Sequence, residues 1–162
     1  MMSGMNSADA AATANLTWRS CRLPELSSLE LARIYRARQE VFVMEQQCIY
    51  LDADGFDERS YHLAAWSPQH ALPLAYARLV EPGGKYAEPS IGRVITLASA
   101  RGTGLGRELV RRLLALSASV HPGWAVRISA QSRLHRFYAE LGFVAVGPDY
   151  MEDGISHVEM LR

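Results

Sequence analysis

The clearest chemical signal in the chain is a glycine-rich turn at residues 101–106, Arg-Gly-Thr-Gly-Leu-Gly. Glycines permit backbone conformations that other residues avoid, and they let a ligand approach the backbone closely. A helix that begins at such a turn presents unpaired N–H groups to an anion. The turn therefore predicts a phosphate or pyrophosphate site. The alternative is a tight strand-to-helix turn that binds nothing.

The spacing of the glycines disfavours two common phosphate ligands. The turn lacks the Gly-Lys-Ser/Thr ending of nucleoside triphosphatases, which disfavours hydrolysis of ATP or GTP. It also departs from the dinucleotide-binding pattern, because Gly106 follows Gly104 too soon and the turn lies past the middle of the chain. NAD is therefore disfavoured as well.

Two motifs around this turn resemble those of the GNAT acyltransferases. Arg101, Gly104 and Gly106 match the family's Arg/Gln-x-x-Gly-x-Gly/Ala signature, and residues 131–143 are similar to its second motif, with Phe137-Tyr138 in register. A wider set of residues resembles the ElaA-type branch of the family, namely Arg38, Val41-Phe42-Val43, Glu45-Gln46, Cys48, Tyr50, Asp52, Asp54-Gly55, Asp57, His62, Gly92-Arg93-Val94, Glu152-Asp153-Gly154-Ile155 and His157. The resemblance therefore covers nearly the whole chain after residue 15.

The resemblance implies a fold and a cofactor site. The fold would be a single mixed α/β (α+β) domain with a mostly antiparallel, seven-stranded sheet splayed into a V and about four helices. Acetyl-CoA would enter between residues 91–97 and 125–131, with an N–H near Ile95 donating to the acyl oxygen. The cofactor-binding residues implied in this way are Val94, Ile95, Thr96, Arg101, Gly102, Thr103, Gly104, Leu105, Gly106, Arg107 and Gln131.

Tyr138 is the predicted general acid. A phenol has an ordinary pKa of about 10, so it is protonated at neutral pH and can donate its proton to a departing thiolate. The position of Tyr138 within the second motif favours this role. The alternative is an amphipathic tyrosine of the core.

The general base, which would accept a proton from the amine, has several candidates. Glu45 lies at the end of a long helical stretch, where the resemblance places the acceptor pocket. His62 and His157 are alternatives, because imidazole exchanges protons near neutral pH. An exposed helical glutamate and hydrogen-bonded structural histidines are the competing interpretations. We predict Tyr138, Glu45 and His62 as the catalytic residues.

Three aspartates at positions 52, 54 and 57 could suggest a metal site. A calcium loop that starts at Asp52 needs a glutamate at its twelfth position, where this sequence has Leu63. The histidines and cysteines are too scattered for a zinc site. We therefore predict no metal. The aspartates are expected to form a solvated or helix-capping loop, or a negative rim that recruits a cationic amine.

Hydrophobic periodicity and turn residues predict the elements that must position these groups. Strands are expected at residues 17–23, 61–66, 74–80, 91–97, 125–130, 143–146 and 158–161, with helices from Ser28 to about residue 42, at 105–116 and at 133–141. Residues 61–66 and 74–80 should pair as an antiparallel hairpin. The order of these elements indicates an α/β domain with mixed strand pairing.

Length and composition exclude several classes of protein. A chain of 162 residues corresponds to about one domain, here residues 16–162 after a small, polar and flexible tail at 1–15. The formal net charge of zero gives no global field that would attract nucleic acid or an anionic membrane. Neither a signal peptide nor an apolar run of the ~20 residues that a bilayer requires is present. Two cysteines outside any CxxC pair indicate a reducing cytoplasm.

The sequence thus predicts a cytoplasmic acyl-CoA-dependent N-acyltransferase. It would transfer acetyl from acetyl-CoA directly to a primary amine of a small molecule or peptide. The alternative is a non-catalytic acyl-CoA-binding sensor or interaction module, which needs the glycine-rich turn but neither Tyr138 nor a base. The expected partners are acetyl-CoA and an amine acceptor, without nucleic acid or membrane, and a homodimer is left open.

Overall fold

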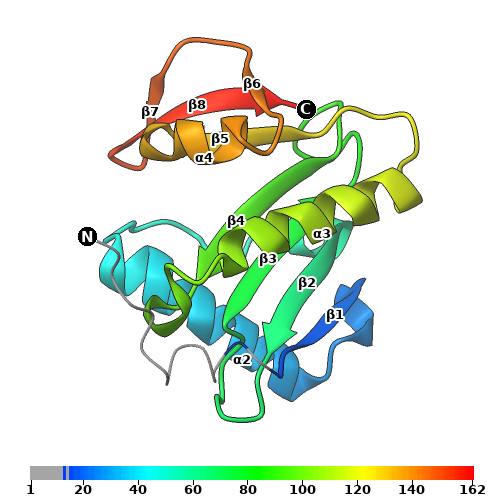
Figure 1. Cartoon of the computed structure of the whole chain (residues 1–162), viewed down its shortest axis with the longest axis vertical. Helices are drawn as coiled ribbons and strands as arrows, with labels where there is room; N and C mark the ends of the chain where they lie inside the picture. Colours follow the sequence, from blue (N-terminus) through cyan, green and yellow to red (C-terminus); the bar gives the residue numbers. More distant parts are fainter. Residues whose placement is uncertain (1–12, 14) are drawn as a thin grey trace.

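A central sheet of eight strands organises the chain, as the computed structural model shows for residues 13 and 15–162 (Figure 1). The strand order is β1-β2-β3-β4-β5-β8-β6, and β7 also pairs with β8. The tail predicted at residues 1–15 lies almost entirely outside the described residues. The mixed, mostly antiparallel sheet predicted from the sequence is confirmed, with one strand more than expected.

Four antiparallel strands form the N-terminal half of the sheet. They are β1 (Thr17–Arg22), β2 (Ser60–Trp66), β3 (Ala75–Val80) and β4 (Ser90–Thr96). The predicted hairpin between β2 and β3 is confirmed, with Ala64 opposite Tyr76. All six residues of β3 are buried, so this strand runs through the centre of the core.

The C-terminal half of the sheet is built around β8 (Ile155–Leu161). One edge of β8 pairs with β5 (Arg127–Gln131), and the other pairs with β6 (Val144–Ala145) and β7 (Tyr150–Glu152). The additional strand is β7, which a tight Asp153-Gly154 turn joins to β8. Both turn residues have positive φ, 50° and 76°, the conformation for which an Asp-Gly pair is suited.

The two halves of the sheet meet along a short stretch and then diverge. β4 and β5 run parallel and pair only at Ser90 with Arg127 and at Ile91 with Ile128. Beyond these pairs, a β-bulge interrupts β4, where its register against β3 shifts between Tyr76 and Arg78. Figure 1 shows β5 and β8 well separated from the far end of β4. This divergence is the V that the sequence resemblance implied.

The bulge also changes which face of the sheet the residues of β4 occupy. Side chains two apart along a regular strand share a face. Ile91 nevertheless packs in the cluster under α3, whereas Ile95 packs in the cluster on the opposite face. The extra residue at the bulge explains this switch, and Arg93, with a φ of 52°, takes up the left-handed conformation there.

Three described α-helices cover the sheet, against the four or so expected. They are α2 (Ser28–Gln39), α3 (Leu105–Val120) and α4 (His135–Ala139), and a π-helical segment, Glu40–Glu45, continues α2. The side chain of Ser27 caps α2 by accepting a hydrogen bond from the Glu30 N–H at 3.1 Å. The long helical stretch predicted from Ser28 is therefore confirmed, with its break at Glu40.

The helices lie on opposite faces of the sheet. Leu109 and Leu113 of α3 pack with Ala77 and Leu79 of β3 on one face. Ile34 of α2 packs with Tyr76 and other residues on the other face. Within residues 13 and 15–162, no helix combines the length and apolar character needed to cross a bilayer.

Candidate active site

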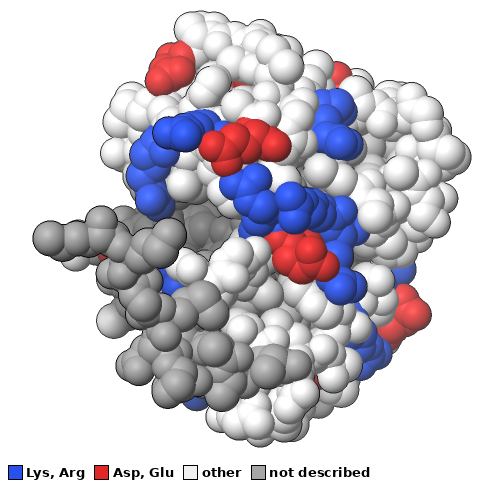
Figure 2. All heavy atoms as spheres, viewed as in Figure 1, with Lys and Arg blue, Asp and Glu red and all other residues white. Residues whose placement is uncertain are grey.

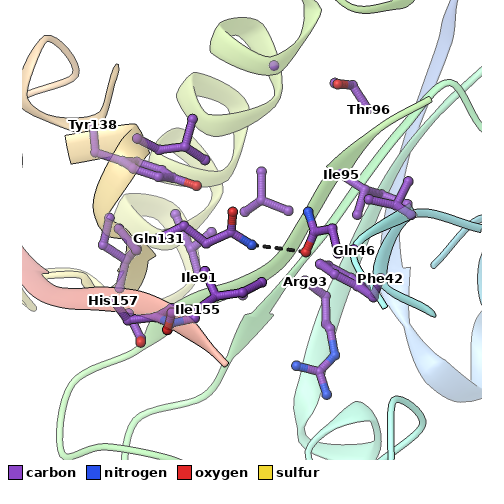
Figure 3. A pocket seen from close by; sticks show the side chains of 18 of the residues that line it. Phe42, Gln46, Ile91, Arg93, Ile95, Thr96, Gln131, Tyr138, Ile155 and His157 are labelled. Carbon is purple, nitrogen blue, oxygen red and sulfur yellow. Dashed lines mark hydrogen bonds between the residues drawn. The ribbon is translucent and has the colours of Figure 1, made fainter. Parts of the chain in front are cut away.

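A cavity of about 1010 Å³ opens where β4 and β5 diverge (Figure 3). It is lined by the π-helical segment, β4, the glycine-rich turn, β5, α4 and the β7–β8 hairpin. Most of the predicted site residues line it, namely Glu45, Val94, Ile95, Thr96, Arg101, Gly102, Gly104, Leu105, Gly106, Arg107, Gln131 and Tyr138. Thr103 and His62 are the two predicted residues that do not.

The glycine-rich turn joins β4 to α3 in the conformation that an anion site requires. Gly102 and Gly104 have φ values of 78° and 85°, in the left-handed region. The first intrahelical bond of α3 runs from the Glu108 N–H to the Gly104 carbonyl at 3.2 Å. The amides of the preceding residues, Leu105, Gly106 and Arg107, thus belong to the helix end whose N–H groups have no intrahelical acceptor.

Arg101 fixes the turn to the end of β4. Its guanidinium donates to the Thr96 carbonyl at 3.0 and 3.1 Å and forms an ion pair with Glu45 at 2.8 Å. The side chain remains 44% exposed, so it can also reach a ligand in the cavity. Thr103 stabilises the same turn, because its hydroxyl donates a hydrogen bond to the Ala100 carbonyl at 2.6 Å.

The edge of β4 beyond the bulge faces the cavity. On its other edge this part of the strand pairs with β3, through Ile95 with Tyr76 and Thr96 with Ala75. Because β5 has diverged, the cavity-side edge has no partner strand there. Peptide groups at such an edge can hydrogen-bond to an amide-containing arm or to a carbonyl oxygen.

Tyr138 reaches the cavity from α4. Its ring packs edge-on against Phe137 and Phe143, with centroids 5.0 and 5.8 Å away, and only 5% of the residue is exposed. Figure 3 shows its hydroxyl directed into the cavity. Burial raises the pKa of the phenol, so Tyr138 is protonated at neutral pH and can donate a proton.

The two predicted bases lie in different surroundings. Glu45 lines the cavity, but its carboxylate pairs with Arg101 beside the glycine-rich turn. His62 is 1% exposed, and both of its ring nitrogens are occupied, by the Tyr76 hydroxyl at 2.7 Å and the Asp57 carbonyl at 2.8 Å. Burial lowers the pKa of His62. We therefore assign His62 a structural role.

The prediction of a solvated loop is wrong for Asp52 and Asp57, and only Asp54 of the three aspartates lines the cavity. Asp52 and Asp57 are buried, and each pairs with Arg38, at 2.9 and 2.8 Å. Arg78 contacts Asp57 at 2.8 Å and also binds Asp54, while Arg93 contacts Asp52 at 3.0 Å. This buried charge cluster holds residues 52–57 against the bulge. Among the described residues, no group of three or more His, Cys, Asp or Glu could hold a metal ion.

Sequence reasoning missed a contact that crosses the cavity. The side-chain amide of Gln131 on β5 donates to the Gln46 side chain at 3.0 Å (Figure 3). Gln46 follows the π-helical segment and lies 85 positions earlier in the chain, so no local spacing could have indicated the pair. The contact links the end of the π-helical segment to β5 across the cavity.

Several arginines of α3 and α4 form ion pairs with neighbouring acids. Arg107 and Arg136 both pair with Glu140, at 2.6 and 3.1 Å, and Arg112 pairs with Glu108 at 2.8 Å. Figure 2 shows basic and acidic side chains interleaved on this face of the molecule.

Comparison with known proteins establishes the family. Residues 37–162 match the family model described as an acetyltransferase (GNAT) domain. A UPF0039 protein from Synechocystis is 43% identical over 146 residues, covering 90% of this chain and 94% of that protein. Protein ElaA from Escherichia coli is 34% identical over 149 residues, covering 91% and 96%. The chain therefore belongs to the GNAT acetyltransferase family.

The solved structures agree with this assignment. The crystal structure of an acyl-CoA N-acyltransferase from Pseudomonas aeruginosa superposes with a TM-score of 0.86 at 39% identity, covering 91% of this chain and 99% of that one. The chain thus has the fold of an acyl-CoA N-acyltransferase.

Proposed function

We propose that the protein transfers an acetyl group from acetyl-CoA to a primary amine of a small molecule or peptide, by direct attack within a ternary complex. The observation that carries this proposal is the single cavity that contains the glycine-rich turn, the unpaired edge of β4 and the Tyr138 hydroxyl. The turn would bind an anion, the β4 edge would bind a carbonyl group, and Tyr138 would donate a proton.

Each part of the cavity suits one part of the cofactor. The amides that begin α3 and the Arg101 side chain would bind the pyrophosphate. The peptide groups of Val94, Ile95 and Thr96 would bind the pantetheine arm and polarise the thioester carbonyl. When the C–S bond breaks, the phenol of Tyr138 would protonate the departing sulfur. Acyl-CoA itself supplies the activated thioester.

A release assay for CoA tests this function against the sensor alternative. Purified protein is given acetyl-CoA and a panel of primary amines that includes ethylamine, phenethylamine, spermidine, lysine and a peptide with a free N-terminus. We expect amine-dependent release of CoA. Acetyl-CoA that binds in calorimetry without any amine-dependent release would instead favour the non-catalytic module.

The same assay establishes the donor when butyryl-CoA and isovaleryl-CoA replace acetyl-CoA. Acetyl specificity predicts a higher kcat/KM for acetyl-CoA than for either longer donor. We further propose a cytoplasmic location, because the two cysteines, Cys21 and Cys48, are both free.

A further inference from the structure

The β7–β8 hairpin places a second titratable pair on the wall of the cavity. Glu152 and His157 both line the cavity, together with Ser129 of β5. In the β5–β8 register, His157 lies opposite Gln131. Ile128 and Ala130 pack toward α3, so the alternating residues Ser129 and Gln131 face the other side of the sheet, as does His157.

The hydrogen bond at Nδ1 of His157 determines whether Nε2 carries a proton in the neutral ring. Nδ1 lies 2.7 Å from the Ile155 carbonyl oxygen, which can only accept a hydrogen bond. Nδ1 must therefore carry a proton. In the neutral ring, Nε2 then carries a lone pair, and it faces the Glu152 carboxylate at 3.9 Å.

The Glu152 carboxylate is held in place by neighbouring hydroxyls. Ser129 donates to its Oε2 at 3.3 Å, and the Ser129 and Tyr150 hydroxyls are hydrogen-bonded to each other. The Tyr150 ring stacks on the imidazole with centroids 6.1 Å apart. Glu152 and Tyr150, both on β7, are the titratable groups that contact the His157 ring.

When His157 is neutral, its Nε2 and the Glu152 carboxylate are two acceptors that a donor placed between them can bridge. Neutral Nε2 and a carboxylate oxygen cannot hydrogen-bond to one another, and 3.9 Å exceeds a hydrogen-bond distance. A primary ammonium group carries several N–H donors and can bind both atoms at once. Its positive charge also complements the carboxylate.

We propose that Glu152 and His157 form the acceptor subsite for a protonated primary amine, and that Nε2 of His157 is the general base. This inference rests on the proposed acyltransferase function. Glu152 binds the ammonium, and His157 removes one proton from it. Glu152 then stabilises the imidazolium that results.

The proposed step balances in atoms and protons. The amine that His157 has deprotonated attacks the thioester carbonyl, so a C–N bond forms and the C–S bond breaks. The thiolate takes the phenolic proton of Tyr138, and the second proton lost by the nitrogen returns to the Tyr138 oxygen. His157 gives its proton to solvent. The products are an amide, CoA and one released proton.

The other candidate bases are less suited to this role. The Glu45 carboxylate is paired with Arg101 beside the glycine-rich turn, at the part of the cavity that suits the pyrophosphate. His62 does not line the cavity, and both of its nitrogens are hydrogen-bonded within the protein. Of these histidines, His157 alone has a ring nitrogen open to the cavity.

A matched pair of amines tests the proposal. Ethylamine is protonated at neutral pH, whereas 2,2,2-trifluoroethylamine is neutral because its fluorine atoms withdraw electron density. His157→Asn keeps a donor for the Ile155 carbonyl but cannot accept a proton, and Glu152→Gln removes the charge. His135→Asn and Glu159→Gln are matched controls, because neither residue lines the cavity.

We expect His157→Asn to lower kcat/KM for ethylamine by roughly 10²–10⁴-fold, and for trifluoroethylamine by less than about tenfold. Glu152→Gln should raise the KM for ethylamine, with acetyl-CoA affinity unchanged in both variants. The two control variants should behave as wild type.

Three results would overturn the inference. Equal losses on the two amines would exclude His157 as the base while leaving the acyltransferase function intact. ¹⁵N NMR provides an independent test that needs no acyl transfer. A proton on Nε2 of neutral His157 would exclude this residue as the base. Wild-type protein that binds acetyl-CoA but acylates neither these two amines nor any amine of the panel would refute the proposed function, and the base with it.

Discussion

Replacing Gly104 by valine separates the fold from the cofactor site. Gly104 has a φ of 85°, and a Cβ added there meets nothing within 4 Å, so the substitution has open space at its first side-chain atom. An L-residue in the left-handed region costs about 1–2 kcal/mol. For a chain of this size, that lowers the melting temperature by about 2–8 °C. Gly104→Val should therefore still fold.

Acetyl-CoA binding should suffer much more. The valine side chain would occupy the space that the pyrophosphate needs beside the amides of Leu105, Gly106 and Arg107. Hydrogen bonds to a charged group contribute about 1.5–3 kcal/mol each. Loss of two such bonds weakens binding by roughly 10²–10⁴-fold. Isothermal calorimetry with acetyl-CoA measures this loss.

Gly123→Val is the matched control for Gly104→Val. Gly123 has a φ of 82° and equally open surroundings, so its substitution carries the same backbone strain. It lies beyond the far end of the 16-residue helix α3, about 24 Å along the helix axis from Gly104. Both variants should lose similar stability, and only Gly104→Val should lose acetyl-CoA binding. Unchanged affinity in a folded Gly104→Val variant would refute the proposed pyrophosphate site.

Three further predictions follow from the structure. Tyr138→Phe keeps the ring packing but removes the proton donor, so kcat should fall by roughly 10²–10⁴-fold with acetyl-CoA affinity unchanged, and turnover within about threefold of wild type would exclude Tyr138 as the acid. Burial raises the pKa of Asp57, but Arg38 and Arg78 lower it by more, so the net pKa lies below its usual value. Asp57 therefore stabilises the fold above the ordinary aspartate pKa of about 4, and this contribution is lost as the pH falls below that value. Asp57→Asn should lower the free energy of unfolding by about 3–5 kcal/mol, measured with urea at neutral pH. The variant should also lose less stability than wild type on acidification. A decrease below about 1 kcal/mol would contradict the role of the charge cluster. Burial raises the pKa of the Cys21 and Cys48 thiols, so both should react slowly with a thiol reagent until the protein is unfolded, and rapid labelling of the native protein would contradict their burial.

Local spacing was sufficient to predict the parts of the fold and site that depend on neighbouring residues. The glycine-rich turn, the start of α3 and the β2–β3 hairpin each follow from a short run of sequence. Tyr138 was placed through its motif, and the structure directs its hydroxyl into the cavity. Its catalytic role stays a prediction.

Features that depend on distant pairing could not be predicted in this way. The aspartates at 52–57 resemble a solvated loop until Arg38, Arg78 and Arg93 are brought to them by the sheet and α2. The face switch within β4 depends on a bulge against β3 that hydrophobic alternation does not show. The strand β7 is short, although the Asp153-Gly154 pair is a hairpin signal that could have revealed it.

The central claim is that the cavity between β4 and β5 transfers an acyl group from CoA to an amine. Acetyl-CoA labelled with ¹³C at the thioester carbonyl, incubated with the protein and the best amine of the panel, reports this transfer directly by NMR. We predict that the thioester signal is replaced by an amide signal, with one CoA released per amide, and that Gly104→Val abolishes the change. Conversion of the label to acetate, or a thioester signal that persists while acetyl-CoA is bound, would contradict the claim.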